Sequence, residues 1–195
     1  MGGSRRPWPS LKRPVLVWGI LAALSLTIAG LIVAAPLATA YGHDSFAFSI
    51  YRTFGHLCHQ IPERSFHVAG HPFAVCARCT GLYFGFAAGV VLYPIVRSLK
   101  ESDGPSLRWL FIAALPLVVD WGLGMLGIWE NTHLSRVASG ALLGGMAAVY
   151  VVPGVIDLSL YKRRTLVPAM PGRATINPSH PSTPLSDYSA PSRRI

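Results

Sequence analysis

The chain has 195 residues, of which 51% are hydrophobic and only 13% are charged. Soluble domains carry about 25% charged residues, so this composition excludes an ordinary soluble protein and indicates an integral membrane protein. A formal net charge of +9 would fit a nucleic-acid partner. The basic residues, however, flank apolar segments, where they serve to orient a membrane protein. We therefore expect the chain to lie in a lipid bilayer and to bind no nucleic acid.

Four apolar segments follow one another along the chain, at about residues 15–35, 80–96, 109–129 and 134–160. A helix that crosses a membrane needs about 20 predominantly apolar residues, and each segment comes close to that length or exceeds it. We therefore predict an all-α integral membrane protein with four transmembrane helices in a membrane domain of residues 15–164.

The first apolar segment has a second interpretation. Basic residues precede it, and the small residues 38–40 resemble the cleavage site of a signal peptide. The apolar core of a signal peptide spans about 7–15 residues, and this one is longer. We expect an uncleaved membrane anchor, with cleavage as the alternative.

Lysine and arginine are distributed unevenly between the loops. An orientation with both ends in the cytoplasm places 13 of the 17 basic residues inside and four outside, as the positive-inside rule requires. We predict a multi-pass protein of the cytoplasmic membrane with a basic cytoplasmic segment 1–14. The loop of residues 41–79 is then extracytoplasmic, and the proline-rich segment 165–195 is a disordered cytoplasmic tail.

Small residues recur every fourth position on the second and fourth spans. Residues at this spacing share one helix face, and small side chains let two helices approach closely in a membrane. We therefore expect these two spans to contact each other along faces made of Gly81, Gly85 and Gly89 on one helix and Gly140, Gly144 and Ala148 on the other.

The segment between the first two spans, which we call the Cys/His loop (residues 41–79), shows two local patterns. Apolar residues recur at helical spacing over residues 44–60, which predicts a short amphipathic helix at the outer membrane surface. Asp44 and Ser45 are plausible N-caps for it. Two short extended runs around Ala69 and Gly70 then predict a small hairpin.

All three cysteines of the chain lie in this loop, and they are suited to binding a metal. Cys76 and Cys79 form a Cys-x-x-Cys pair, and Cys58 precedes them by 18 residues. Three thiolates and one imidazole form a known tetrahedral zinc site. We take His59 as the first candidate for the fourth ligand, with His56, one helical turn earlier, as the alternative.

A redox interpretation uses the same three cysteines. A Cys-x-x-Cys pair at the start of a helix has a lowered thiol pKa, and on the oxidising side of a membrane such a pair can exchange disulfides. The alternative function is therefore a membrane thiol-disulfide oxidoreductase that passes electrons to a quinone.

Polar residues within the apolar spans form a second candidate cluster. Asp120 lies inside the third span, and Asn131 and Arg136 lie at the start of the fourth. A carboxylate inside a membrane usually faces the helix bundle and has a partner, which predicts an Asp120–Arg136 pair below the Cys/His loop. Asn131 and Thr132 can also cap the fourth span. A metal-dependent hydrolase and an ion or small-molecule transporter are lesser alternatives.

Several of these motifs resemble a family of small prokaryotic predicted membrane proteins of unknown function. The pattern of that family is CHQxPxRS, then CxRCxGxYxG, then an aspartate in the next span, then NxxxxRxxxG. The resemblance covers about residues 50–160 and implies membership rather than an activity. It adds Gln60, Arg64 and Arg78 as candidates for contact with a substrate or an anion. Here the pattern falls on Cys58, His59, Gln60, Pro62, Arg64, Ser65, Cys76, Arg78, Cys79, Gly81, Tyr83, Gly85, Asp120, Asn131, Arg136 and Gly140.

Overall fold

The computed structural model describes residues 12–99, 104–128 and 130–166. It is mostly helical, and four of its helices are long and apolar enough to span a membrane. This confirms the all-α fold with four candidate spans. The residues 1–11 and the predicted disordered tail, from 167 onward, lie outside the described residues. The four long helices are α1 (Lys12–Ala40), α3 (Ala77–Val96), α4 (Arg108–Met125) and α5 (His133–Leu166).

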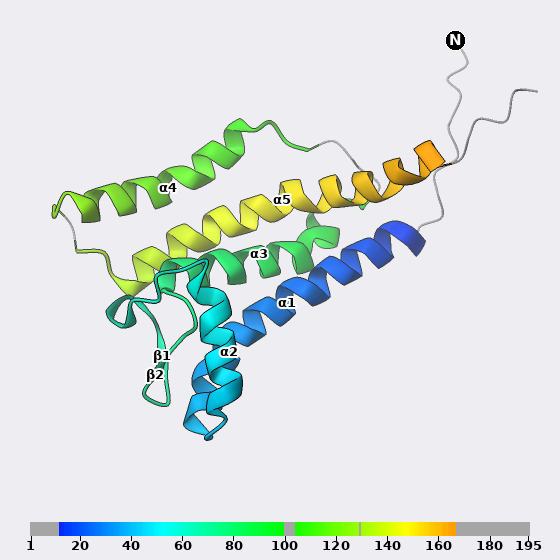
Figure 1. Ribbon diagram of the computed structural model, residues 1–195. Helices are drawn as coiled ribbons and strands as arrows, with labels where there is room; N and C mark the ends of the chain where they lie inside the picture. Colours follow the sequence, from blue (N-terminus) through cyan, green and yellow to red (C-terminus); the bar gives the residue numbers. More distant parts are fainter. Residues whose placement is uncertain (1–11, 100–103, 129, 167–195) are drawn as a thin grey trace, which may run out of the picture.

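Helices α1, α3 and α5 run side by side, and α4 lies against α5 on the far side from α1 (Figure 1). No residue of α4 is buried, so this helix is the most exposed of the four. It also ends at Met125, four residues before the predicted end of the third span. Gly127 follows with a φ of +66°, a left-handed conformation that ends a helix and suits glycine.

The closest helix pair is α3 and α5, as the small-residue pattern predicted. A methyl group on Gly81 would collide with the backbone of Val137, and one on Gly144 would collide with the backbone of Leu82. The two helices therefore touch backbone to backbone, which larger residues at these positions would prevent. This contact fixes the start of α3 beside the start of α5.

A proline inside α3 connects this helix to α1. Pro94 has no backbone N–H, so the carbonyl of Val90, four residues earlier, loses its helical partner. The indole Nε1 of Trp18 in α1 donates a hydrogen bond of 2.7 Å to that carbonyl. An unsatisfied backbone carbonyl is costly away from water, so this contact stabilises the packing of α1 on α3.

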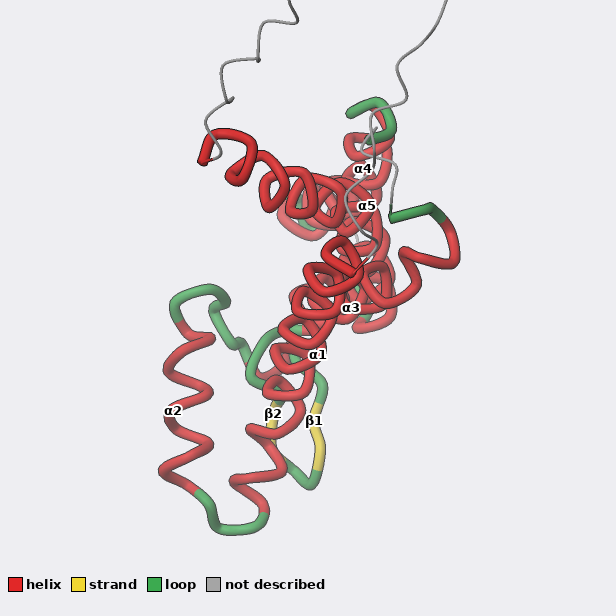
Figure 2. Tube along the Cα trace, turned by 90° about the vertical axis from the view of Figure 1, so that its right-hand side faces the viewer, coloured by secondary structure: helices red, strands yellow, loops and turns green. Residues whose placement is uncertain are grey.

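The Cys/His loop folds into α2 (Asp44–Gly55), the short 3-10 helix η1 (Pro62–Arg64) and the strands β1 (His67–Val68) and β2 (His71–Pro72). The strands pair antiparallel, which confirms the hairpin. These elements gather at one end of α1 and α3 in Figure 1, and Figure 2 shows α2 and the two strands together, apart from α4 and α5.

The expected helix over residues 44–60 is shorter than predicted. It ends at Gly55, and the N–H groups of Leu57 and Cys58 both turn back to the carbonyl of Phe54. Gln60 then adopts a left-handed φ of +50°, which no helix allows. The predicted N-caps, Asp44 and Ser45, are also wrong, because His43 occupies the N-cap position and makes no side-chain cap.

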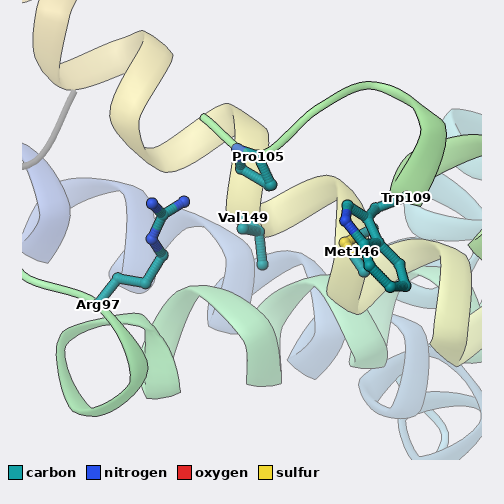
Figure 3. Close-up of a pocket in the computed structure, with 5 residues that line it drawn as sticks. All are labelled: Arg97, Pro105, Trp109, Met146 and Val149. Carbon is teal, nitrogen blue, oxygen red and sulfur yellow. The ribbon is translucent and has the colours of Figure 1, made fainter. Parts of the chain in front are cut away.

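A hollow lies at the opposite end of α3 from the Cys/His loop. It measures about 340 Å³ and is lined by Arg97, Pro105, Trp109, Met146 and Val149, between the start of α4 and the middle of α5 (Figure 3). Arg97 follows the last residue of α3, whereas the cysteines lie before and within its first turn. This open and mostly apolar hollow is therefore separate from the candidate site.

Candidate metal centre

Three thiols meet at the start of α3. The sulfur atoms of Cys58, Cys76 and Cys79 all lie within 4.8 Å of one another, and all three cysteines are free. Cys58 is only 7% exposed and comes from the turn after α2. Cys76 is the N-cap of α3, and Cys79 lies in its first turn. The meeting of these three residues, which the sequence predicted, is therefore present in the structure.

Gln60 holds together the two segments that carry the thiols. Its side-chain amide donates hydrogen bonds to the carbonyl of Tyr51 in α2, at 2.7 Å, and to that of Ala74, at 2.8 Å. The hydroxyl of Tyr51 in turn donates to the carbonyl of Pro72 in the hairpin, at 2.5 Å. These bonds give Gln60, predicted as a candidate for substrate contact, a structural role beside the thiols.

A second proline anchors the same segment to α1. Pro36 lacks an N–H group, which leaves the carbonyl of Ile32 without its helical partner. The N–H of Ala74 donates to this carbonyl at 3.3 Å. Ile32 and Ala74 are fully buried in one apolar cluster with Cys58, so the thiols rest on a packed base rather than on a free loop.

Hydrogen bonds within the thiol cluster favour the ionised form of one cysteine. The thiols of Cys58 and Cys79 donate to the sulfur of Cys76 and lower the pKa of the Cys76 thiol. The backbone N–H of Cys76 also donates to the sulfur of Cys58, at 3.3 Å. A thiolate is the form of cysteine that binds metals and attacks disulfides, so the cluster suits either chemistry.

The histidines lie outside the thiol cluster. Within the part of the chain that the structure describes, only the three cysteines bring their ligand atoms this close together. The side chains of His59 and His56 are both exposed. The identity of a fourth ligand therefore stays a prediction.

The intramembrane carboxylate pairs with a different arginine from the one expected. Asp120 accepts a 2.5 Å charge-assisted hydrogen bond from Arg78, and the two side chains are 10% and 22% exposed. The predicted Asp120–Arg136 pair is wrong. Helix α5 contacts both α3 and α4, which brings Arg78, in the first turn of α3, within reach of Asp120 in α4.

Asn131 belongs to the same polar cluster rather than to a helix cap. Its amide nitrogen donates to the backbone carbonyl and to Oδ2 of Asp120, at 2.5 and 3.1 Å. The cap of α5 is Thr132, whose hydroxyl accepts a 3.1 Å hydrogen bond from the N–H of Ser135. The two residues that the sequence offered as alternative caps therefore have separate roles.

Comparison of the sequence with known proteins identifies the family of this chain. A protein of Methanocaldococcus jannaschii described as uncharacterized is 34% identical over 114 residues, which cover 58% of this chain and 72% of the relative. A family model described as "Predicted membrane protein (DUF2085)" matches residues 58–150. The chain belongs to the DUF2085 family. A second uncharacterized protein, from Methanothermobacter thermautotrophicus, is 34% identical to this DUF2085 chain over 97 residues, which cover 49% of the chain and 86% of the relative. No solved structure matches.

The family match confirms the resemblance found in the sequence. It begins at Cys58 and includes the thiol cluster, Asp120 and Asn131, whereas α1 and α2 precede it.

The roles of Tyr51 and Pro36 in supporting the thiol cluster were not predicted from the sequence. A proline inside a long apolar span was an available signal, because it frees a carbonyl for a partner from another segment.

Proposed function

We propose that this DUF2085 protein binds one zinc ion through Cys58, Cys76 and Cys79 on the extracytoplasmic side of the cytoplasmic membrane. The observation that carries the proposal is the approach of three sulfur atoms from two segments to within 4.8 Å of one another. Thiolates around tetrahedral zinc, with Zn–S bonds of about 2.3 Å, lie about 3.8 Å apart. The thiols therefore need only a small contraction to surround an ion.

The fourth ligand decides what kind of zinc site this is. A structural site has four protein ligands, whereas a catalytic site has three and a water or substrate. We propose His59 as the fourth ligand and His56 as the alternative, because both lie within two residues of Cys58 in the chain. The zinc then joins α3 to the Cys/His loop, and the polar pair of Arg78 and Asp120 lies beside it.

The extracytoplasmic location rests on the distribution of basic residues. Seventeen lysines and arginines occur in the chain, and an orientation with both ends inside places only four of them outside. An oxidising compartment makes accessible free thiols unstable, and Cys76 and Cys79 are partly exposed. Zinc binding protects them, which supports a metal at this position.

A second candidate function is thiol–disulfide exchange, favoured by the position of Cys76 and Cys79 at the N-terminus of α3 with Cys58 beside them. In this reaction two thiols form one disulfide and release two electrons and two protons. A membrane quinone accepts them and becomes a quinol. The same residues would then serve redox chemistry instead of metal binding.

Metal analysis combined with thiol counting separates the two functions. We expect about one zinc per chain in the detergent-purified protein and three thiols that react only after the metal is chelated. The Cys76→Ser variant should lose the zinc, and the His67→Ala variant, changed at an exposed hairpin residue, should keep it. Metal-free protein with a disulfide between two of the three cysteines would exclude the zinc site in favour of the redox function.

A further inference from the structure

Three arginines from three separate elements lie near the pair of Arg78 and Asp120, and one of the three is Arg78 itself. Arg64 belongs to η1, Arg78 to α3 and Arg136 to α5. The ring of Phe66, two residues after Arg64, lies 5.6 Å from the ring of His133, three residues before Arg136. Gly140, one helical turn after Arg136, lies against the backbone carbonyl of Arg78. These contacts bring the segments that carry Arg64, Arg78 and Arg136 together beside Asp120.

Arg136 has no partner of its own in this cluster. The carboxylate of Asp120 is taken by Arg78, and the Arg136 guanidinium makes no hydrogen bond or ion pair within the described part of the chain. It is also the fourth residue of α5, where the helix dipole opposes a cation and favours an anion. A negative partner would stabilise a partly buried arginine at this position.

The proposed zinc does not supply enough negative charge. A zinc ion with three thiolates carries a net charge of −1, and Asp120 adds another −1. The three arginines carry +3, so the cluster keeps a surplus positive charge with or without the metal. An anionic ligand would offset this surplus.

Two buried polar atoms in the cluster also lack hydrogen-bond partners: Nε of Arg78 and Oδ1 of Asn131. The amide orientation of Asn131 is fixed, because its nitrogen donates to two oxygens of Asp120. One unsatisfied atom is therefore a donor and the other an acceptor. Buried groups of this kind are normally satisfied, so a ligand that satisfies both would offer an oxygen acceptor and a hydroxyl donor.

We propose that Arg64, Arg78, Arg136 and Asn131 form a binding site for a phosphate group that carries one hydroxyl, either free phosphate or a phosphate monoester. The tetrahedral oxygens of such a group can meet arginines from three elements, whereas one planar carboxylate suits a single arginine fork. Its P–OH donates to an acceptor such as Oδ1 of Asn131. This site goes beyond the proposed zinc site and does not depend on it.

The experiment measures phosphate binding to the full-length protein in a maltoside detergent, which contains no phosphate. Inorganic phosphate is titrated by calorimetry in one arm, and phosphatidic acid is added to the same micelles in the other, with phosphatidylcholine as the lipid without a P–OH group. We expect saturable binding of either inorganic phosphate, which identifies a soluble ligand, or phosphatidic acid alone, which identifies a lipid headgroup.

Substitutions of the proposed site residues show where the phosphate binds. Arg136→Gln and Arg64→Gln should each weaken binding at least about tenfold, and Arg136→Lys should recover part of it. Arg64 is exposed, so its variant keeps the fold even if Arg136→Gln does not. Arg52→Gln, the same change at an exposed residue of α2, is the matched control and should bind like the unchanged protein.

The proposal is overturned if neither phosphate compound binds, or if Arg52→Gln weakens binding as much as Arg64→Gln and Arg136→Gln. Zinc content is measured in the same samples. If the protein contains zinc but binds no phosphate compound, the phosphate site is wrong and the zinc site stands. If it binds phosphate but contains no zinc, the zinc site is wrong and the phosphate site stands.

Discussion

At the scale of single residues, Arg78 connects the two halves of the site. It lies between Cys76 and Cys79 in the chain, and its side chain reaches Asp120 in α4. A change at Arg78 therefore acts on α4 through this pair. The sequence placed both residues in the site but did not pair them, because a helix position alone does not show which of two nearby arginines reaches a carboxylate.

Asp120→Asn tests the energetic importance of that pair. The substitution keeps the shape of the side chain but leaves the largely buried Arg78 without its counter-charge, so we expect a loss of about 1.5–3 kcal/mol in the free energy of unfolding. Thermal unfolding in detergent measures it. Asp157→Asn, at an exposed site on α5, is the control, and equal effects of the two substitutions would contradict the paired role of Asp120.

His59→Ala and His56→Ala test the fourth ligand. If His59 completes the zinc site, its replacement should weaken zinc affinity at least about tenfold, whereas His56→Ala should leave it nearly unchanged. Competition with a chromophoric chelator measures both affinities. The opposite ranking would assign the ligand to His56, and unchanged affinity in both variants would mean that no histidine of this turn binds the metal.

At the scale of secondary-structure elements, the contact between α3 and α5 positions the site. The small-residue pattern predicted this contact correctly, because residues at i, i+4 and i+8 share one face regardless of tertiary context. The hairpin was predicted for a similar local reason, since Ala69 and Gly70 both adopt positive φ in its two-residue turn. The end of α2 was not predicted, because the left-handed Gln60 is stabilised by bonds to distant carbonyls.

Gly144→Ala tests the importance of the helix contact. A methyl group there meets the backbone of Leu82, so the helices must move apart, and we expect a loss of about 1–3 kcal/mol in the free energy of unfolding. Gly154→Ala, on the same helix with open space around its Cβ position, should be neutral or slightly stabilising. Unfolding midpoints compare them. If both variants unfold at the same temperature, the close contact does not limit stability.

At the scale of the whole molecule, composition and hydropathy were sufficient to predict four candidate spans, since the length of an apolar segment is a local property. The arrangement of the spans was not predictable in the same way. The exposed position of α4 and the two proline-freed carbonyls that bind Trp18 and Ala74 depend on which segments meet. Those contacts join residues 72 and 42 positions apart in the chain, beyond the reach of local patterns.

Reporter fusions test the proposed orientation of the whole molecule. With both ends in the cytoplasm, green fluorescent protein fused after residue 195 should fluoresce, and alkaline phosphatase inserted at Gly70, in the turn of the hairpin, should be active. Alkaline phosphatase placed in the loop between α3 and α4 is the control and should be inactive. The reverse pattern of activities would place the thiols in the cytoplasm.

X-ray absorption at the zinc edge tests the central claim most directly, because it reports the atoms bound to the metal. For the purified protein we predict a shell of three sulfur atoms at about 2.3 Å and one nitrogen or oxygen atom at about 2.0–2.1 Å. A zinc ion surrounded only by nitrogen and oxygen, or a protein without zinc whose mass shows a disulfide among Cys58, Cys76 and Cys79, would contradict the account.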